Sequence, residues 1–140
     1  MSPADIERLK FLKRIFSKEI FNLQYSSQQV FGDGQFDVKI LSIENNCAFA
    51  QTLEAYTSRF CRLQDTVGDK LLPACLAALQ EPTKAAIDNL DKAEKLGFLN
   101  SVEEWIQVRQ LRNKMAQAYE VNLIAFANNM LSYLYDKKIV

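Results

Sequence analysis

The stretch that decides the fold is Phe49-Ala-Gln-Thr-Leu53-Glu-Ala-Tyr56-Thr-Ser-Arg-Phe60-Cys-Arg-Leu63-Gln-Asp-Thr-Val67. Its large apolar side chains recur at steps of four and three residues, which places them on one side of an α-helix. An uninterrupted stripe of this kind is typical of the core seam of a helix bundle. The stretch therefore predicts a long helix whose apolar stripe lies in the core.

Helical periodicity extends over most of the chain on both sides of this stretch. Turn-forming residues separate the periodic segments, and Ser101 with Glu104 forms a capping box that predicts the start of a helix. Before the long central helix, the sequence predicts a helix from Pro3 to between Tyr25 and Gln29 and a loop over 31–36. After it come a helix over 68–80 that is kinked at Pro73 and a short helix over 84–96, in which Ile87, Leu90 and Leu96 face inward. A helix from Ser101 to about Tyr119 follows, and the last helix runs from about Asn122 to Asp136 with Leu123, Ala127, Met130 and Leu134 facing inward.

These elements predict an all-α fold, a four-helix up-and-down bundle with one or two short additional helices. The 140 residues form a single domain over 1–140, since this length supports one hydrophobic core and not two. Only four glycines and three prolines are present, which disfavours a many-turned β fold.

The balance of charges and the lack of histidine exclude several classes of function. Lys+Arg and Asp+Glu both number 17, so a general polybasic nucleic-acid or membrane-surface protein is excluded, while a local basic patch is still allowed. The chain has no histidine, which excludes Ser-His-Asp and Cys-His catalysis and zinc sites that contain His.

We expect a cytoplasmic protein that has no membrane span, metal or cofactor. No apolar signal-peptide core follows Met1, and the apolar stretch over 71–79 is far shorter than the ~20 residues that span a bilayer. Cys47, Cys61 and Cys75 are odd in number and lack a Cys-x-x-Cys pair, which indicates buried apolar cysteines rather than a metal or redox site.

Residues 105–119 have features that a purely structural helix does not need. On the predicted helix Arg112 falls on the apolar arc between Trp105 and Tyr119, so it must pair with a carboxylate, line a cleft or meet another subunit. Together with Arg109 and Lys114 it gives a local charge of +3 without an acid, which suits phosphates and bases, although a solvated helix face is equally ordinary. Trp105 reads as an anchor of the core or of a dimer rather than as a stacking platform.

The segment Glu104-Trp-Ile-Gln-Val-Arg-Gln-Leu-Arg112-Asn-Lys-Met-Ala-Gln117-Ala-Tyr119 resembles the signature helix of HEPN domains. The similarity is greatest to the HepT-like subunits that are encoded beside a minimal nucleotidyltransferase. That family's motif is Arg, a polar residue that is often Asn, three residues, His, one residue and Tyr. Arg112, Asn113 and Tyr119 match this motif in register, and Gln117 stands at the His position.

The resemblance implies an all-α homodimer in a toxin–antitoxin system. Many members are metal-independent RNA endonucleases that a partner nucleotidyltransferase neutralises, in some pairs by adding AMP to the motif tyrosine. It implies that Arg112 binds phosphate or transition-state charge, that Asn113 orients the substrate, and that Tyr119 is a candidate for AMPylation. Arg112 and Tyr119 lie within about 20° on a regular helix, so we expect two copies of this helix to meet across a two-fold axis and form a cleft.

Gln117 changes the expected mechanism. A carboxamide does not exchange a proton near neutral pH, and loss of a general base typically lowers the rate by about 10²–10⁴-fold. We therefore expect a binding subunit that contacts the nucleotidyltransferase and RNA or nucleotide without efficient cleavage. The alternatives are an active ribonuclease toxin that relies on Arg112 and Tyr119, and a helical assembly module unrelated to HEPN domains.

Overall fold

A computed structural model of the chain describes residues 2–108 and 114–139, and the side chains of residues 2–107 and 119–139. All regular structure in these residues is helical, which confirms the predicted all-α class. In chain order the elements are α1 (Pro3–Phe31), α2 (Phe36–Leu41), the 3₁₀ turn η1 (Ile43–Asn45), α3 (Cys47–Thr66), the π-helical turn η2 (Val67–Leu71), α4 (Leu72–Ala78), α5 (Ala86–Lys95), α6 (Val102–Val108) and α7 (Lys114–Asp136).

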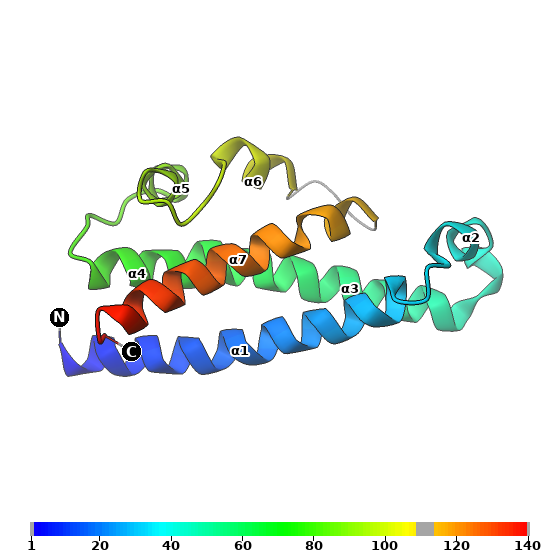
Figure 1. Ribbon diagram of the computed structural model, residues 1–140, viewed down its shortest axis with the longest axis horizontal. Helices are drawn as coiled ribbons and strands as arrows, with labels where there is room; N and C mark the ends of the chain where they lie inside the picture. Colours follow the sequence, from blue (N-terminus) through cyan, green and yellow to red (C-terminus); the bar gives the residue numbers. More distant parts are fainter. Residues whose placement is uncertain (1, 109–113, 140) are drawn as a thin grey trace.

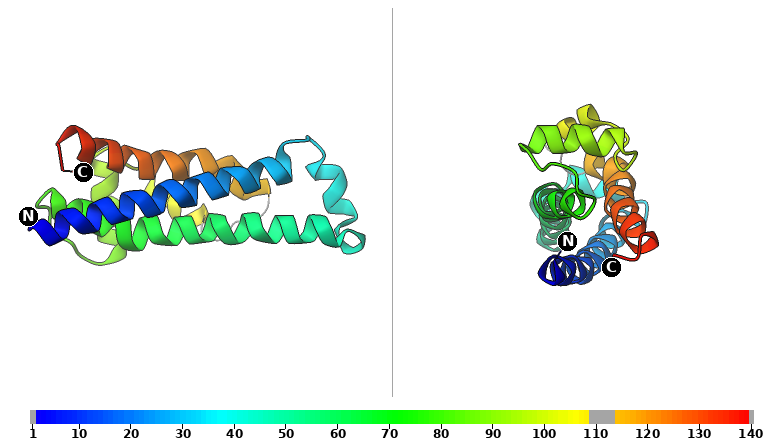
Figure 2. Two further views of the ribbon diagram at one scale, coloured as in Figure 1. Left: turned by 90° about the horizontal axis from the view of Figure 1, so that it is seen from below. Right: turned by 90° about the vertical axis from the view of Figure 1, so that its left-hand side faces the viewer.

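Three long helical segments lie alongside one another (Figure 1). The first is α1, the second is the continuous rod of α3, η2 and α4, and the third is α7. The short helices α5 and α6 carry the chain back from the end of α4 toward the start of α7, on the side of the molecule away from α1. The end-on view in Figure 2 shows the same separation of α1 from α5 and α6.

The stripe of α3 forms the centre of the core, as its spacing predicts. Phe49, Leu53, Tyr56, Phe60, Leu63 and Val67 are all buried. The four inward residues predicted for the last helix, Leu123, Ala127, Met130 and Leu134, are buried as well. In α5 only part of the prediction holds, because Leu90 is buried whereas Ile87 and Leu96 are exposed.

The first helix is longer than its periodicity predicts. It begins at a capping box, in which the Ser2 hydroxyl accepts from the Asp5 N–H at 3.2 Å and the Ser2 N–H donates to the Asp5 carboxylate at 3.2 Å. The Ser2 N–H and, at 3.0 Å, the Ser2 hydroxyl both donate to the Asp5 carboxylate, and these two hydrogen bonds lower the pKa of Asp5. The helix continues to Phe31 because Val30, beyond the predicted end, is still buried against the core.

A π-helical turn, rather than a kink at Pro73 itself, joins α3 to α4. Proline has no N–H to donate to the residue four positions earlier, so the turn before it must widen or break. Here the turn widens, and the Leu72 N–H donates to the Val67 carbonyl five residues earlier. The rod therefore stays continuous through Pro73.

The predicted single helix from Ser101 to Tyr119 is wrong. The Trp105 and Phe126 rings are 5.3 Å apart between centroids, and the Asn122 amide donates to the Glu104 carboxylate at 2.7 Å. On one straight helix 21 residues would separate Trp105 from Phe126 by about 32 Å. α6 and α7 are therefore two separate helices that lie against each other, and the predicted break between Tyr119 and Asn122 lies inside α7.

In the described residues, none of the helices combines the length and the apolar character that crossing a membrane requires.

Candidate functional site

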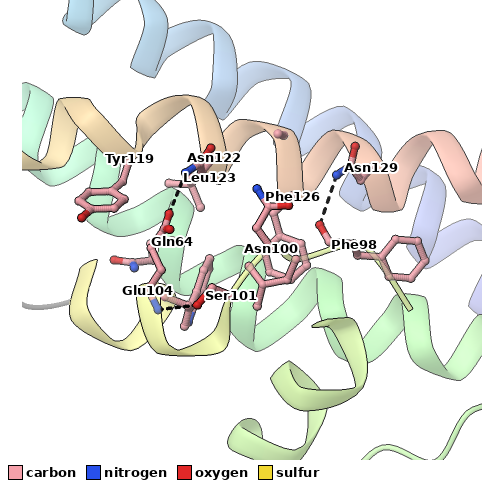
Figure 3. Close-up of a pocket in the computed structure, with 13 residues that line it drawn as sticks. Gln64, Phe98, Asn100, Ser101, Glu104, Tyr119, Asn122, Leu123, Phe126 and Asn129 are labelled. Carbon is pink, nitrogen blue, oxygen red and sulfur yellow. Dashed lines mark hydrogen bonds between the residues drawn. The ribbon is translucent and has the colours of Figure 1, made fainter. Parts of the chain in front are cut away.

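A narrow pocket opens where α3, α6 and α7 meet the loop that precedes α6 (Figure 3). Aromatic and aliphatic side chains form its walls, and amides, a hydroxyl and one carboxylate face into it. The lining residues are Gln64, Phe98, Leu99, Asn100, Ser101, Glu104, Trp105, Tyr119, Asn122, Leu123, Ala125, Phe126 and Asn129. About 30 Å³ is open to the centres of water molecules, which is room for about two waters.

Local hydrogen bonds hold the α6 side of the pocket in place. Gly97, at φ 82°, ends α5 in a conformation that favours glycine. The Glu94 carboxylate then accepts from the Val102 N–H at 2.6 Å, and the Ser101 hydroxyl accepts from the Glu104 N–H at 3.1 Å. The second contact is the Ser101 half of the predicted capping box, and it confirms the predicted start of a helix at this position.

Trp105 forms the floor of the pocket and belongs to the core. Its indole is 6% exposed and meets the Phe126 ring at an interplanar angle of 88°. On the opposite side it presses against the backbone of η2, where a Cβ on Gly68 would lie 3.1 Å from the indole Cζ2. The prediction that Trp105 anchors a core, rather than serving as a stacking platform, is therefore confirmed.

The polar end of the pocket contains a buried amide without a partner. Gln64 is 3% exposed, and its Nε2 makes no hydrogen bond to any described residue. Figure 3 shows Gln64, Glu104 and Tyr119 at this end, and Phe98 and Asn129 at the other. The site therefore offers an N–H donor near a carboxylate, in a space that admits water or the edge of a planar group.

Behind this end, a buried hydrogen bond joins α3 to α7. The Tyr56 hydroxyl donates to the Glu120 carboxylate at 3.0 Å, and both side chains are buried. Burial, followed by the negative charge of Glu120 and this hydrogen bond, raises the pKa of Tyr56. Tyr56 therefore stays neutral and serves to hold the two helices together.

The structure brings together two of the predicted site residues. Trp105 and Tyr119 line the same pocket, because α6 and α7 fold against each other and not because they share a face of one helix. The expectation that Arg112 and Tyr119 share a groove two turns apart concerns Arg112, which lies outside the described residues, so it stays a prediction. Three of the predicted site residues, Arg109, Arg112 and Asn113, lie outside the described residues. Lys114 and Gln117 lie in α7, but their side chains are not among those that the structure describes.

Gln64, Glu104 and Asn122 are among the polar residues of the site that were not predicted from the sequence. Gln64 gave a signal, since it lies four residues after Phe60 and three before Val67, and so borders the apolar stripe. Glu104 was interpreted only as part of a cap, and Asn122 as the start of a helix. The pairing of Glu104 with Asn122 follows from the packing of α6 against α7, which the periodicity of the sequence does not indicate.

In the described residues, no group of three or more Cys, Asp or Glu side chains is placed to hold a metal ion. Comparisons of the chain with protein-family models, curated proteins and solved structures find no match. The resemblance to HEPN domains therefore stays a prediction that depends on the residues of one segment.

Proposed function

We propose that the protein is a HEPN-like homodimeric subunit of a toxin–antitoxin type system that binds a partner nucleotidyltransferase, and RNA or nucleotide, without efficient cleavage. One observation carries the proposal. Trp105 and Tyr119, at opposite ends of the segment that resembles the HEPN signature, line one polar pocket in a chain that has no histidine. The segment thus contributes to a site, and that site lacks the histidine that the motif of HEPN domains supplies as general base.

Two other reactive side chains of the described residues are buried and do not replace histidine. Tyr56 is held neutral by burial and by Glu120, and burial raises the pKa of the Cys75 thiol to about 12. A thiol with that pKa supplies almost no thiolate at neutral pH. Binding is therefore the function that these residues support, ahead of ribonuclease activity.

The proposed architecture is a four-helix up-and-down bundle. Three helices of the proposed bundle are α1, the α3–α4 rod and α7. The short helices α5 and α6 together take the place of the fourth, which connects α4 to α7. Tyr119 is half-buried at one end of the pocket, which supports its proposed role as an AMPylation target. The proposed compartment is the cytoplasm, and free thiols at Cys47, Cys61 and Cys75 support it.

The test combines an RNA assay with a modification assay. Purified protein is incubated with tRNA and mRNA, and we expect intact RNA. The protein is then incubated with ATP and the minimal nucleotidyltransferase that we expect to be encoded beside it, and mass spectrometry is expected to show one AMP on Tyr119. Tyr119→Phe removes this mass shift, and the matched variant Tyr133→Phe keeps it.

The opposite outcomes separate the alternatives. RNA cleavage that disappears in Arg112→Ala would establish the ribonuclease. A strict monomer across micromolar concentrations in sedimentation, with no binding to the nucleotidyltransferase, would leave the unrelated helical module.

A further inference from the structure

The outer face of α1 carries a row of aromatic and basic side chains that the core does not use. Phe11, Arg14, Lys18, Phe21 and Tyr25, here called the α1 outer stripe, follow one another at steps of three and four residues, and so lie along one side of the helix. Their aromatic members are unusually exposed, with 53% of Phe11, 68% of Phe21 and 58% of Tyr25 open to solvent. Single exposed aromatics are ordinary, whereas three in one row indicate an interaction surface.

Two cations lie on the same face, and two more lie beside it. Lys10, Lys13, Arg14 and Lys18 surround a shallow hollow on the surface of α1. Between Arg8 and the end of α1 the sequence has one acid, Glu19, and its carboxylate is turned toward α3, where it accepts from the Thr66 hydroxyl at 3.0 Å. In the described residues no carboxylate lies within ion-pair distance of Arg14 or Lys18.

The helix α1 lies at the edge of the molecule. In the view from below in Figure 2 it lies in front of the other helices, and in Figure 1 α5 and α6 lie on the far side of the bundle. The α1 outer stripe is therefore remote from the pocket lined by Trp105 and Tyr119.

We infer that the α1 outer stripe binds single-stranded nucleic acid. Nonspecific sites for single strands combine cations that follow the phosphates with aromatic rings on which bases stack. Both groups are present here along one helix face, with the two cations between the aromatic rings. The stripe extends over 15 residues from Phe11 to Tyr25, whose Cα atoms are about 21 Å apart along the helix axis, the length of about six stacked nucleotides.

The order of side chains in the stripe disfavours a membrane surface. A helix that lies in a lipid interface keeps its apolar face continuous and places its cations at the flanks. In the α1 outer stripe Arg14 and Lys18 occupy the middle, between Phe11 and Phe21. Insertion of both rings would bring two charges into the apolar layer.

Pairing with a second copy is disfavoured by charge. An antiparallel pair of α1 helices that sets Phe11 against Tyr25 brings Lys18 against Lys18 at the two-fold axis. A parallel pair sets Arg14 against Arg14. An anionic strand meets neither repulsion, so it is the occupant that the charges favour.

The test measures binding of a fluorescein-labelled oligothymidylate of about 12 nucleotides, a length within the usual site size, by anisotropy at low and at near-physiological salt. We expect binding that weakens with salt. Phe21→Ala lowers the affinity by about tenfold, since one stacked base is lost. Arg14→Gln with Lys18→Gln reduces the slope of log K against log salt by about 1.4, at about 0.7 for each phosphate contact.

Matched variants on other surfaces serve as controls. Lys84→Gln with Lys95→Gln removes the same charge from exposed positions around α5, and Leu41→Ala removes an apolar side chain that is 88% exposed on α2. Neither change is expected to alter the affinity. All of these sites are on the surface, so circular dichroism is expected to show unchanged folding.

The inference does not depend on the resemblance to HEPN domains. Failure of AMPylation or of partner binding would not affect the inference about the α1 outer stripe. Arg112→Ala changes the segment that resembles HEPN domains and not the α1 outer stripe, so it separates the two sites. The inference is overturned if the oligonucleotide does not bind at low salt, or if the α1 variants bind as well as the parent. It is also overturned if Phe21→Ala abolishes binding to phosphatidylserine vesicles or self-association while oligonucleotide binding is unchanged.

Discussion

Tyr56 of α3 and Glu120 of α7 form a buried hydrogen bond of 3.0 Å between residues 64 positions apart in the chain. The bond ties the central rod to the last helix beside the pocket that contains Gln64. It satisfies a hydroxyl and a carboxylate that would otherwise be costly to bury. The pair therefore fixes how α7 lies against α3.

Replacement of Tyr56 by Phe is expected to lower the free energy of unfolding by about 2 kcal/mol at neutral pH, because it removes a hydrogen bond to a buried carboxylate. The pKa of Tyr56 is raised above its ordinary value of 10.0, so the folded state keeps the hydroxyl neutral. In the unfolded chain the hydroxyl ionises near pH 10. The contribution of the pair is therefore fully present below that pH, and it is lost as the pH rises further.

Urea unfolding of the parent and of Tyr56→Phe, at pH 7 and above pH 10, measures this effect. The difference in stability between the two proteins is expected to shrink at alkaline pH. The exposed Tyr135, replaced by Phe, is the control and is expected to change neither value. An equal difference at both pH values would contradict the assignment.

Gly68→Ala is expected to destabilise the protein, although alanine normally favours a helix. The propensity gain is at most about 1 kcal/mol, whereas overpacking of a core costs about 1–3 kcal/mol. The added Cβ would lie 3.1 Å from Trp105, whose indole is held between η2 and Phe126. We expect a net loss of about 1 kcal/mol and a shift in the emission of this single tryptophan.

A double-mutant cycle with Trp105→Phe isolates the contact. In the Trp105→Phe background Gly68→Ala is expected to become neutral or stabilising, as measured by unfolding followed with circular dichroism. A loss of stability that is the same in both backgrounds would show that the indole is not the cause.

The core of this fold could be predicted because local periodicity specifies it. The steps of three and four residues from Phe49 to Val67 correctly gave one buried stripe. The same reasoning failed over 101–119, because no glycine or proline in the sequence marks the separation of α6 from α7. Only the contacts of Trp105 with Phe126 and of Glu104 with Asn122 reveal it.

The site was predictable only in part, for the same physical reason. Trp105 and Tyr119 were selected from the right segment, but their meeting depends on how α6 packs against α7. Arg59 is a second example. It donates to the Asn22 carbonyl at 3.2 Å and to the Ser26 hydroxyl at 2.5 Å, and its position beside the seam gave no indication of these acceptors on α1.

Asn89 is expected to be essential for the turn between α4 and α5. It is 5% exposed, and its side chain accepts from the Lys84 N–H at 2.9 Å and donates to the Lys84 carbonyl at 3.1 Å. Asn89→Ala leaves both backbone groups without a partner and is expected to cost about 2–3 kcal/mol in urea unfolding.

Asn89→Asp is the matched variant. It still accepts from the Lys84 N–H but sets a carboxylate against the Lys84 carbonyl. We therefore expect a loss at neutral pH that decreases as acid protonates the added carboxyl, because the protonated form donates to that carbonyl. A loss that does not depend on pH would contradict this account of the turn.

Gln64→Leu is expected to stabilise the protein, because it removes a buried amide that has no partner. An unsatisfied buried donor costs about 1–3 kcal/mol, and leucine has a similar volume and none of that penalty. We expect the free energy of unfolding to rise by about 1 kcal/mol, as measured by urea titration. Gln64→Glu is the matched control and is expected to destabilise the protein, since it buries a charge next to Glu104. A loss of stability in Gln64→Leu would instead show that the amide gains a hydrogen-bond partner in solution, and it would assign the polar end of the pocket to a bound water or ligand.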